Sequence, residues 1–189
     1  MTRLQKLASA IAVTGIAAVG LYISLPHLLR TGADAEPMNF VAVTDRLASS
    51  GQPSAAQLQR LRARGYALVI NLAPPESFGS IANEGELVVS QGLAYINIPV
   101  DWQKPAERDF QLFSDVLNSN RDRQVWVHCQ MNMRASAFLF LYRVIHDRQP
   151  VARAIEPVHA VWVPNEVWRG FLQSILTRHR IAFDPDTLR

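Results

Sequence analysis

The chain has 189 residues, of which 49% are hydrophobic, enough for one core of ordinary size, and no change of composition marks a second folded domain. The formal net charge of +3 comes from arginines scattered along the sequence, so nucleic-acid binding is not expected. The single cysteine excludes an internal disulfide, and no His, Cys or carboxylate cluster has the spacing of metal ligands, so neither a metal nor another cofactor is expected.

Residues 1–36 are predicted to be a membrane anchor or signal segment, and one domain is predicted over 37–189. Two basic residues precede an uncharged run from Leu7 to Leu25, which is long enough to cross a bilayer as a helix. Basic residues ahead of such a run favour export of the chain on its C-terminal side, so we expect a membrane-anchored, exported domain. Ala33-Asp34-Ala35 fits the small-x-small pattern of signal peptidase sites, so secretion after cleavage is the alternative.

Strands and helices alternate through the first half of the domain. In chain order the pattern predicts strands over 40–43 and 47–50, a helix over 55–64, a strand over 67–72, a helix over 81–90 and a strand over 93–100. Ser54 is a plausible N-cap for the first helix, and Gly65 ends it.

The second half continues the alternation. Residues 107–118 form an amphipathic pattern, with Phe110, Phe113 and Leu117 on one helix face. A buried strand then ends near His128, a long helix comes after it, and shorter helices are predicted over 151–156 and 165–176. This order predicts an α/β fold with a mostly parallel central sheet flanked by helices.

Cys129 stands directly after the apolar run that predicts this last strand, and a short polar loop separates it from Arg134. The order places the thiol at the carboxyl end of a strand and near the N-terminus of a helix, with a guanidinium close by. Both the helix dipole and the cation stabilise a thiolate, and the backbone amides of such a loop point toward a bound anion. The alternative is a buried core cysteine. The change from apolar to polar residues at this position favours a functional thiol.

Over roughly residues 40–176 the chain resembles the cysteine-dependent protein tyrosine and dual-specificity phosphatases, in particular their compact bacterial branch. The matching pieces are the opening phrase Leu47–Ser54, the strand Val69–Leu72, the segment Ile98–Asp101, and His128-Cys129 with Arg134 and Ser136 after them. Their order and spacing together are more specific than any one of them.

The resemblance implies hydrolysis of a phosphate monoester, on a protein or a small molecule, through a phosphocysteine. It implies Cys129 as nucleophile, Arg134 as bidentate ligand of the phosphoryl oxygens and Asp101 as proton donor. His128 would orient the loop. The implied substrate-binding residues are Gln130, Met131, Asn132, Met133 and Ser136. The two methionine side chains are expected to pack beneath the loop, and Ser136 to bond the thiolate or cap the helix.

The loop departs from the phosphatase signature because it has four residues between cysteine and arginine, where the signature has five. Either the loop is one residue shorter, or Asn132 takes the position of a signature glycine and the arginine comes one step early. Asparagine tolerates the left-handed conformation that the second alignment requires.

Two other functions remain open on the sequence. Rhodanese-type sulfurtransferases also place four residues between cysteine and arginine, which makes a sulfurtransferase the rival enzyme. The opening phrase and Asp101 favour the phosphatase. The third hypothesis is an inactive phosphatase fold that binds a phosphorylated partner or acts as a scaffold.

Overall fold

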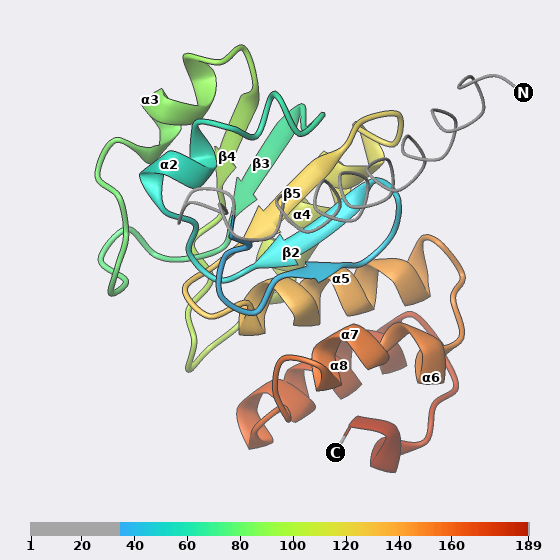
Figure 1. The fold of residues 1–189 in the computed structure, drawn as a ribbon. Coiled ribbons are helices and arrows are strands. Elements are labelled where there is room, and N and C mark those ends of the chain that lie inside the picture. The colour runs from blue at the N-terminus through green and yellow to red at the C-terminus, as the bar shows by residue number, and fades with distance from the viewer. Residues whose placement is uncertain (1–34, 189) are drawn as a thin grey trace, which may run out of the picture. The chain divides into compact units, whose positions relative to one another are not determined.

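A five-stranded sheet organises the residues that the computed structural model describes, 35–188 (Figure 1). The strands are β1 (Val41–Ala42), β2 (Leu47–Ser50), β3 (Leu68–Asn71), β4 (Ala94–Asn97) and β5 (Val125–His128). Their order across the sheet is β1-β2-β5-β3-β4. Only β1 runs antiparallel to its neighbour, and the other pairs are parallel. The predicted α/β fold with a mostly parallel sheet is therefore confirmed.

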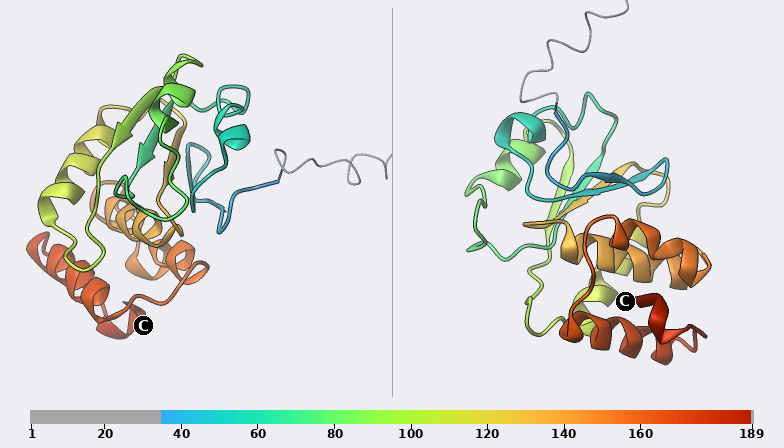
Figure 2. Two further views of the ribbon diagram at one scale, coloured as in Figure 1. Left: turned by 90° about the vertical axis from the view of Figure 1, so that its left-hand side faces the viewer. Right: turned by 60° about the horizontal axis from the view of Figure 1, so that its bottom comes forward.

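Helices cover both faces of this sheet (Figure 2). α2 (Ala55–Leu58) and α3 (Glu84–Val89) lie on one face. The other group comprises α4 (Glu107–Asn118), α5 (Met133–Ile145), α6 (Val151–Ala154), α7 (Glu156–His159) and α8 (Glu166–Arg178), and a short 3-10 helix, η2 (Pro185–Leu188), comes last. All these elements belong to one compact unit that begins at Glu36.

Alternate residues of the central strands supply two separate cores, as the two-residue period of a strand requires. Val125 and Val127 of β5 join the larger core with α4, α5, α7 and α8, whereas Trp126 joins the smaller core beneath α2 and α3. The continuous apolar run of β5 is thus explained by burial on both faces, which is typical of parallel sheets.

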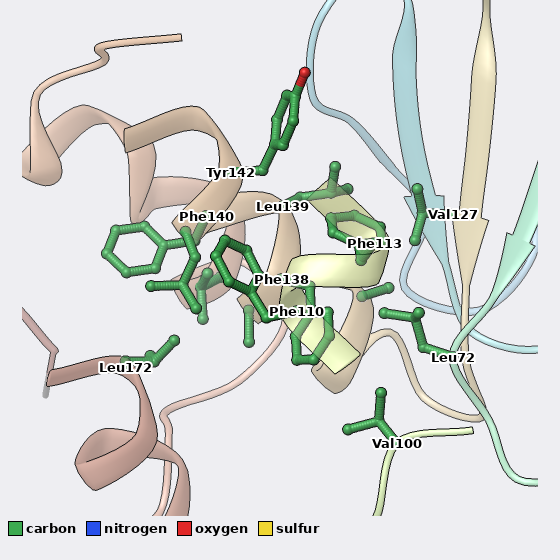
Figure 3. Close-up of a cluster of buried hydrophobic side chains, with 14 of the residues drawn as sticks. Leu72, Val100, Phe110, Phe113, Val127, Phe138, Leu139, Phe140, Tyr142 and Leu172 are labelled. Carbon is green, nitrogen blue, oxygen red and sulfur yellow. The ribbon is translucent and has the colours of Figure 1, made fainter. Parts of the chain in front are cut away.

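The larger core is built around α5, whose residues are nearly all buried. Figure 3 shows Phe110 and Phe113 of α4 directed toward Phe138 of α5. The ring of Phe138 meets those of Phe110 and Phe113 edge-on, with centroids 5.7 and 5.5 Å apart. Because α5 begins directly after the cysteine loop, this packing fixes one end of that loop.

Two helix predictions need correction. The helix expected over 55–64 ends as α2 at Leu58, because the next amides, of Arg60 and Leu61, bond three residues back rather than four. The helix expected over 151–156 divides into α6 and α7. Pro157 has no N–H with which to continue the bonding pattern of α6. The predictions for Ser54 as N-cap and for α4 over 107–118 are confirmed.

The predicted membrane or signal segment, including the run from Leu7 to Leu25, lies outside the described residues and stays a prediction. Within residues 35–188, none of the helices has the length and apolar character needed to span a bilayer.

Candidate active site

Cys129 lies in the loop that leaves the carboxyl end of β5, between two parallel neighbours. A pocket of about 290 Å³ opens over this loop, and its lining residues are Trp102, Cys129, Gln130, Met131, Met133 and Arg134. The structure thus brings the predicted nucleophile and the predicted phosphate ligand into one pocket. Such a place, outside the carboxyl ends of parallel strands, is where ligands bind in open α/β sheets.

The thiol forms part of the pocket floor although none of Cys129 is exposed to solvent. Its amide donates to the carbonyl of Ser50 on β2, at 3.3 Å, which ties the start of the loop to the sheet. The neighbouring core also contacts Cys129 from below. Cys129 thus lies between the larger core and the pocket.

Arg134 is the second residue of α5 and is only 8% exposed. Its Nε is buried and has no hydrogen-bond partner among the described residues. The guanidinium carbon lies 5.4 Å from the ring centroid of Trp102, which forms the facing wall. A buried cation at a helix N-terminus is unfavourable both for its desolvation and for the helix dipole. The placement is explained if the arginine serves an anion in the pocket.

Among residues 35–188, Arg134 is the only charged residue in the pocket lining, and no cluster of three or more His, Cys, Asp or Glu side chains suited to a metal occurs there. An anion bound here would be held by one guanidinium and by loop amides near the start of α5.

The loop itself is held in an unusual conformation at Asn132, which has φ 66° and ψ −1°. This is the left-handed conformation that the alignment of Asn132 with a glycine position expects. The side-chain Nδ2 of Asn132 donates to the backbone carbonyl of Asn39 at 2.6 Å, and the side-chain Nδ2 of Asn39 donates to the backbone carbonyl of Met131 at 3.0 Å. Hydrogen bonds from the chain before β1 therefore fix the loop.

The opening phrase also supports the loop. The amide of Gln52 donates to the carbonyl of Gln130 at 3.1 Å, and the amide of Gly51 donates to that of Met38 at 2.7 Å. A Cβ at Gly51 would lie 3.0 Å from the carbonyl oxygen of Gln130. The phrase thus needs glycine at this position because the two backbones approach so closely.

Of the predicted substrate-binding residues, Gln130, Met131 and Met133 line the pocket, whereas Asn132 and Ser136 do not. Ser136 donates to the carbonyl of Met133 at 3.1 Å and accepts from Trp162 Nε1 at 3.3 Å. The expectation that both methionines pack beneath the loop was wrong. Met131 is 37% exposed, and both residues form pocket wall.

Asp101 is exposed and directly precedes Trp102 in the chain. Trp102 lines the pocket, whereas Asp101 does not. Its Oδ1 accepts hydrogen bonds from the amides of Gln103, at 2.8 Å, and Lys104, at 3.3 Å. These bonds shape the loop after β4.

His128 and Glu84 form a buried pair behind the loop that the sequence did not reveal. The histidine Nε2 donates to Glu84 Oε1 at 2.8 Å, with His128 fully buried and Glu84 only 3% exposed. Asn71 of β3 donates to the same oxygen at 3.2 Å, and Gln52 donates to Oε2 at 2.6 Å. Glu84 therefore connects β3, β5 and the opening phrase. From the sequence it resembled an ordinary acidic residue in the first turn of a helix.

Burial by itself raises the pKa of the Glu84 carboxyl. Hydrogen bonds from His128, Gln52 and Tyr95, together with the electrostatic interaction with His128, outweigh this effect, so the pKa lies below its ordinary value of 4.5. Burial raises the pKa of Tyr95 to about 12, and the nearby Glu84 carboxylate adds to that shift. Glu84 is consequently held as a carboxylate behind the residue that precedes the cysteine.

Comparison with known families agrees with this geometry. The family described as "DSP-PTPase phosphatase fused to NAD+ Kinase" matches residues 33–162, which include both the opening phrase and the cysteine loop. The prediction of a cysteine-dependent phosphatase is confirmed at the level of the family, and none of these comparisons favours a sulfurtransferase.

Individual relatives and solved structures also match the chain. The crystal structure of a DUF442 protein of Shewanella putrefaciens CN-32 is 32% identical, with 76% of this chain and 94% of that one covered at a TM-score of 0.69. The "Beta-lactamase hydrolase-like protein" of Xylella fastidiosa (strain Temecula1) is 34% identical over 114 residues, which are 59% of this chain but only 26% of that protein. The chain thus spans about a quarter of the curated relatives it matches.

More distant structures share the fold alone. The core catalytic domain of the PP-IP phosphatase SIW14 from S. cerevisiae, in complex with citrate, is 11% identical, with a TM-score of 0.62 over 77% of this chain and 95% of that one. From the extent of the family match, this chain belongs to the DSP-PTPase phosphatase family and carries a cysteine-dependent phosphatase domain.

Proposed function

We propose that the chain hydrolyses phosphate monoesters through a phosphocysteine at Cys129. The observation that carries this proposal is the shared pocket of Cys129 and Arg134, in which the arginine is buried and its Nε has no hydrogen-bond partner among the described residues. A phosphoryl group bound to that guanidinium would supply the missing charge and would lie against the sulfur.

In the first step the thiolate attacks phosphorus while the bond from phosphorus to the ester oxygen breaks. Asp101 gives its proton to the departing oxygen, so an alcohol or phenol leaves and a phosphocysteine remains. Asp101 is exposed and directly precedes Trp102, a residue of the pocket lining, which supports its role as donor to a leaving group that points outward.

In the second step water attacks the phosphocysteine. The Asp101 carboxylate accepts a proton from that water, and the bond from sulfur to phosphorus breaks, which releases inorganic phosphate and restores the thiolate. Arg134 keeps its bonds to the phosphoryl oxygens in both steps and stabilises the charge that they carry.

The test is phosphate release from phenyl phosphate by the full chain and by Cys129→Ser. We expect the substitution to lower kcat by about 10⁴-fold or more, because the nucleophile is lost. Circular dichroism would check that the variant is folded. Thiocyanate formation from thiosulfate and cyanide, without phosphate release, would instead identify the rival sulfurtransferase. Unchanged phosphate release by Cys129→Ser would contradict the phosphocysteine mechanism. If neither the wild type nor Cys129→Ser releases phosphate but both bind a phosphorylated ligand equally well, the chain is a binding domain.

A further inference from the structure

A second hollow adjoins the catalytic pocket, and it is larger, at about 460 Å³. Gln130 and Met131 line both hollows, so the two are neighbours on either side of the cysteine loop. The second hollow, called the side groove below, is bounded by the chain before β1, by the opening phrase after β2 and by the loop after β3. Its size is within the range of small-molecule sites.

Most of the exposed surface of the side groove is apolar, although Gln52, Ser54, Gln57 and Gln130 also line it. Phe78, in the loop after β3, is 88% exposed, Met38 is 56% exposed and Met131 is 37% exposed, and all three contribute to it. Single exposed hydrophobic side chains are ordinary on protein surfaces, but a group gathered around one hollow marks a place where apolar surface can be buried by a ligand.

The charges around the two hollows argue against a substrate with several phosphates. Arg134 is the only cation among the described residues that line either of them. The charged residue of the side groove is Glu36, whose carboxylate pairs with Arg64 at 2.8 Å. A second phosphate group placed in the side groove would meet a carboxylate and no lining cation, whereas polyanion sites gather several basic side chains.

We propose that the side groove holds the apolar, uncharged body of a small monophosphate ester whose phosphoryl group occupies the Cys129 pocket. This inference rests on the proposed function and narrows its substrate class. Phe78 and Met38 would then be specificity-determining residues, which bind the part of the substrate beyond the ester oxygen.

The experiment compares the full chain on two esters whose phenols have similar acidity, phenyl phosphate and 4-biphenylyl phosphate. We expect kcat/KM to be about tenfold higher for the biphenylyl ester, mainly through KM, since the second ring is buried away from the reacting atoms. Phe78→Ala, alone and with Met38→Ala, should reduce the ratio of kcat/KM for the biphenylyl ester to that for the phenyl ester to less than about threefold. Leu112→Ala, which removes a half-exposed leucine from α4, should leave the preference unchanged.

Three outcomes would overturn the inference. The first is an equal kcat/KM for the two esters, or a preference that Phe78→Ala and Met38→Ala leave unaltered. The second is faster hydrolysis of a biphenyl that carries a phosphate at each end. The third is a kcat/KM for a phosphotyrosine peptide that is about tenfold higher than for the biphenylyl ester and that falls in Phe78→Ala. That result would assign the groove to a protein partner. Absence of Cys129-dependent phosphate release from phenyl phosphate would instead contradict the proposed function itself, so the two failures are distinguishable.

Discussion

Glu84 shows how one buried side chain supports the cysteine loop from a distance. It accepts hydrogen bonds from His128, Asn71 and Gln52, which belong to three different parts of the chain. His128 precedes Cys129 directly, and Gln52 bonds the loop through its own amide. Because the other histidine nitrogen, Nδ1, is buried without a partner in the described part of the chain, the orientation of the ring depends on Glu84.

Glu84→Gln should destabilise the protein at pH 7 by about 2 kcal/mol, since hydrogen bonds to a buried charge are weakened. The pKa of Glu84 is lower in the folded protein than its ordinary value of 4.5, so its stabilising contribution is fully present above that value and is lost as the pH falls through the lowered pKa. Urea denaturation at pH 7 and at pH 3 should therefore show a smaller difference between wild type and variant in acid. An equal or larger difference at pH 3 would contradict the assignment.

At the scale of the element, the start of α5 depends on one residue with positive φ. Asn132 turns the chain from the loop into the helix at φ 66°, and the amide of Ser136 then bonds the Asn132 carbonyl at 2.9 Å. A residue with this backbone conformation is strained unless it is glycine or asparagine. Arg134 is the second residue of α5, so the turn at Asn132 also sets where the arginine lies.

Asn132→Gly and Asn132→Ala provide a matched pair, since both lose the hydrogen bond to the Asn39 carbonyl and differ only in Cβ. The glycine variant should be more stable by about 1 kcal/mol, which is the cost of a Cβ in the left-handed region. Thermal or urea unfolding of the two variants would measure it. If alanine proves as stable as glycine, the turn does not have a positive φ.

At the scale of the whole molecule, the aromatic core between α4, α5 and α8 holds the catalytic pocket in place. Phe138 packs against rings on both α4 and α8, and Trp168 of α8 donates to the carbonyl of Trp102 at 3.1 Å. Trp102 in turn faces Arg134. The C-terminal helix therefore positions a pocket wall that lies 66 residues earlier in the chain.

Phe138→Ala should cost about 3–5 kcal/mol, because the cavity it leaves lies among rigid aromatic neighbours. Equilibrium denaturation would measure the loss, with Leu112→Ala on the exposed face of α4 as the control, for which a change within about 0.5 kcal/mol is expected. A small loss for Phe138→Ala would show that this core can collapse around the cavity.

Much of the fold could be predicted from local patterns in the sequence. The apolar runs of β3 and β5, the amphipathic spacing of α4 and the cap at Ser54 all depend on neighbours within a few residues, and each was predicted. The predicted helix boundaries were wrong at the end of α2, where hydrogen bonds change to three-residue spacing, and between α6 and α7, where Pro157 interrupts the bonding. The position of Cys129 between strand and helix was likewise local and could be predicted.

Local sequence thus specifies the set of strands and helices, and its motifs carry the family resemblance. Only the folded chain establishes which distant residues meet: Glu84 with His128, Trp102 with Arg134, and Met38 with Phe78 around one groove. The reason is physical. Periodicity reports which face of an element is buried, but the order of strands in the sheet sets the partners across it, and those contacts join segments far apart in the chain, so they leave no local pattern.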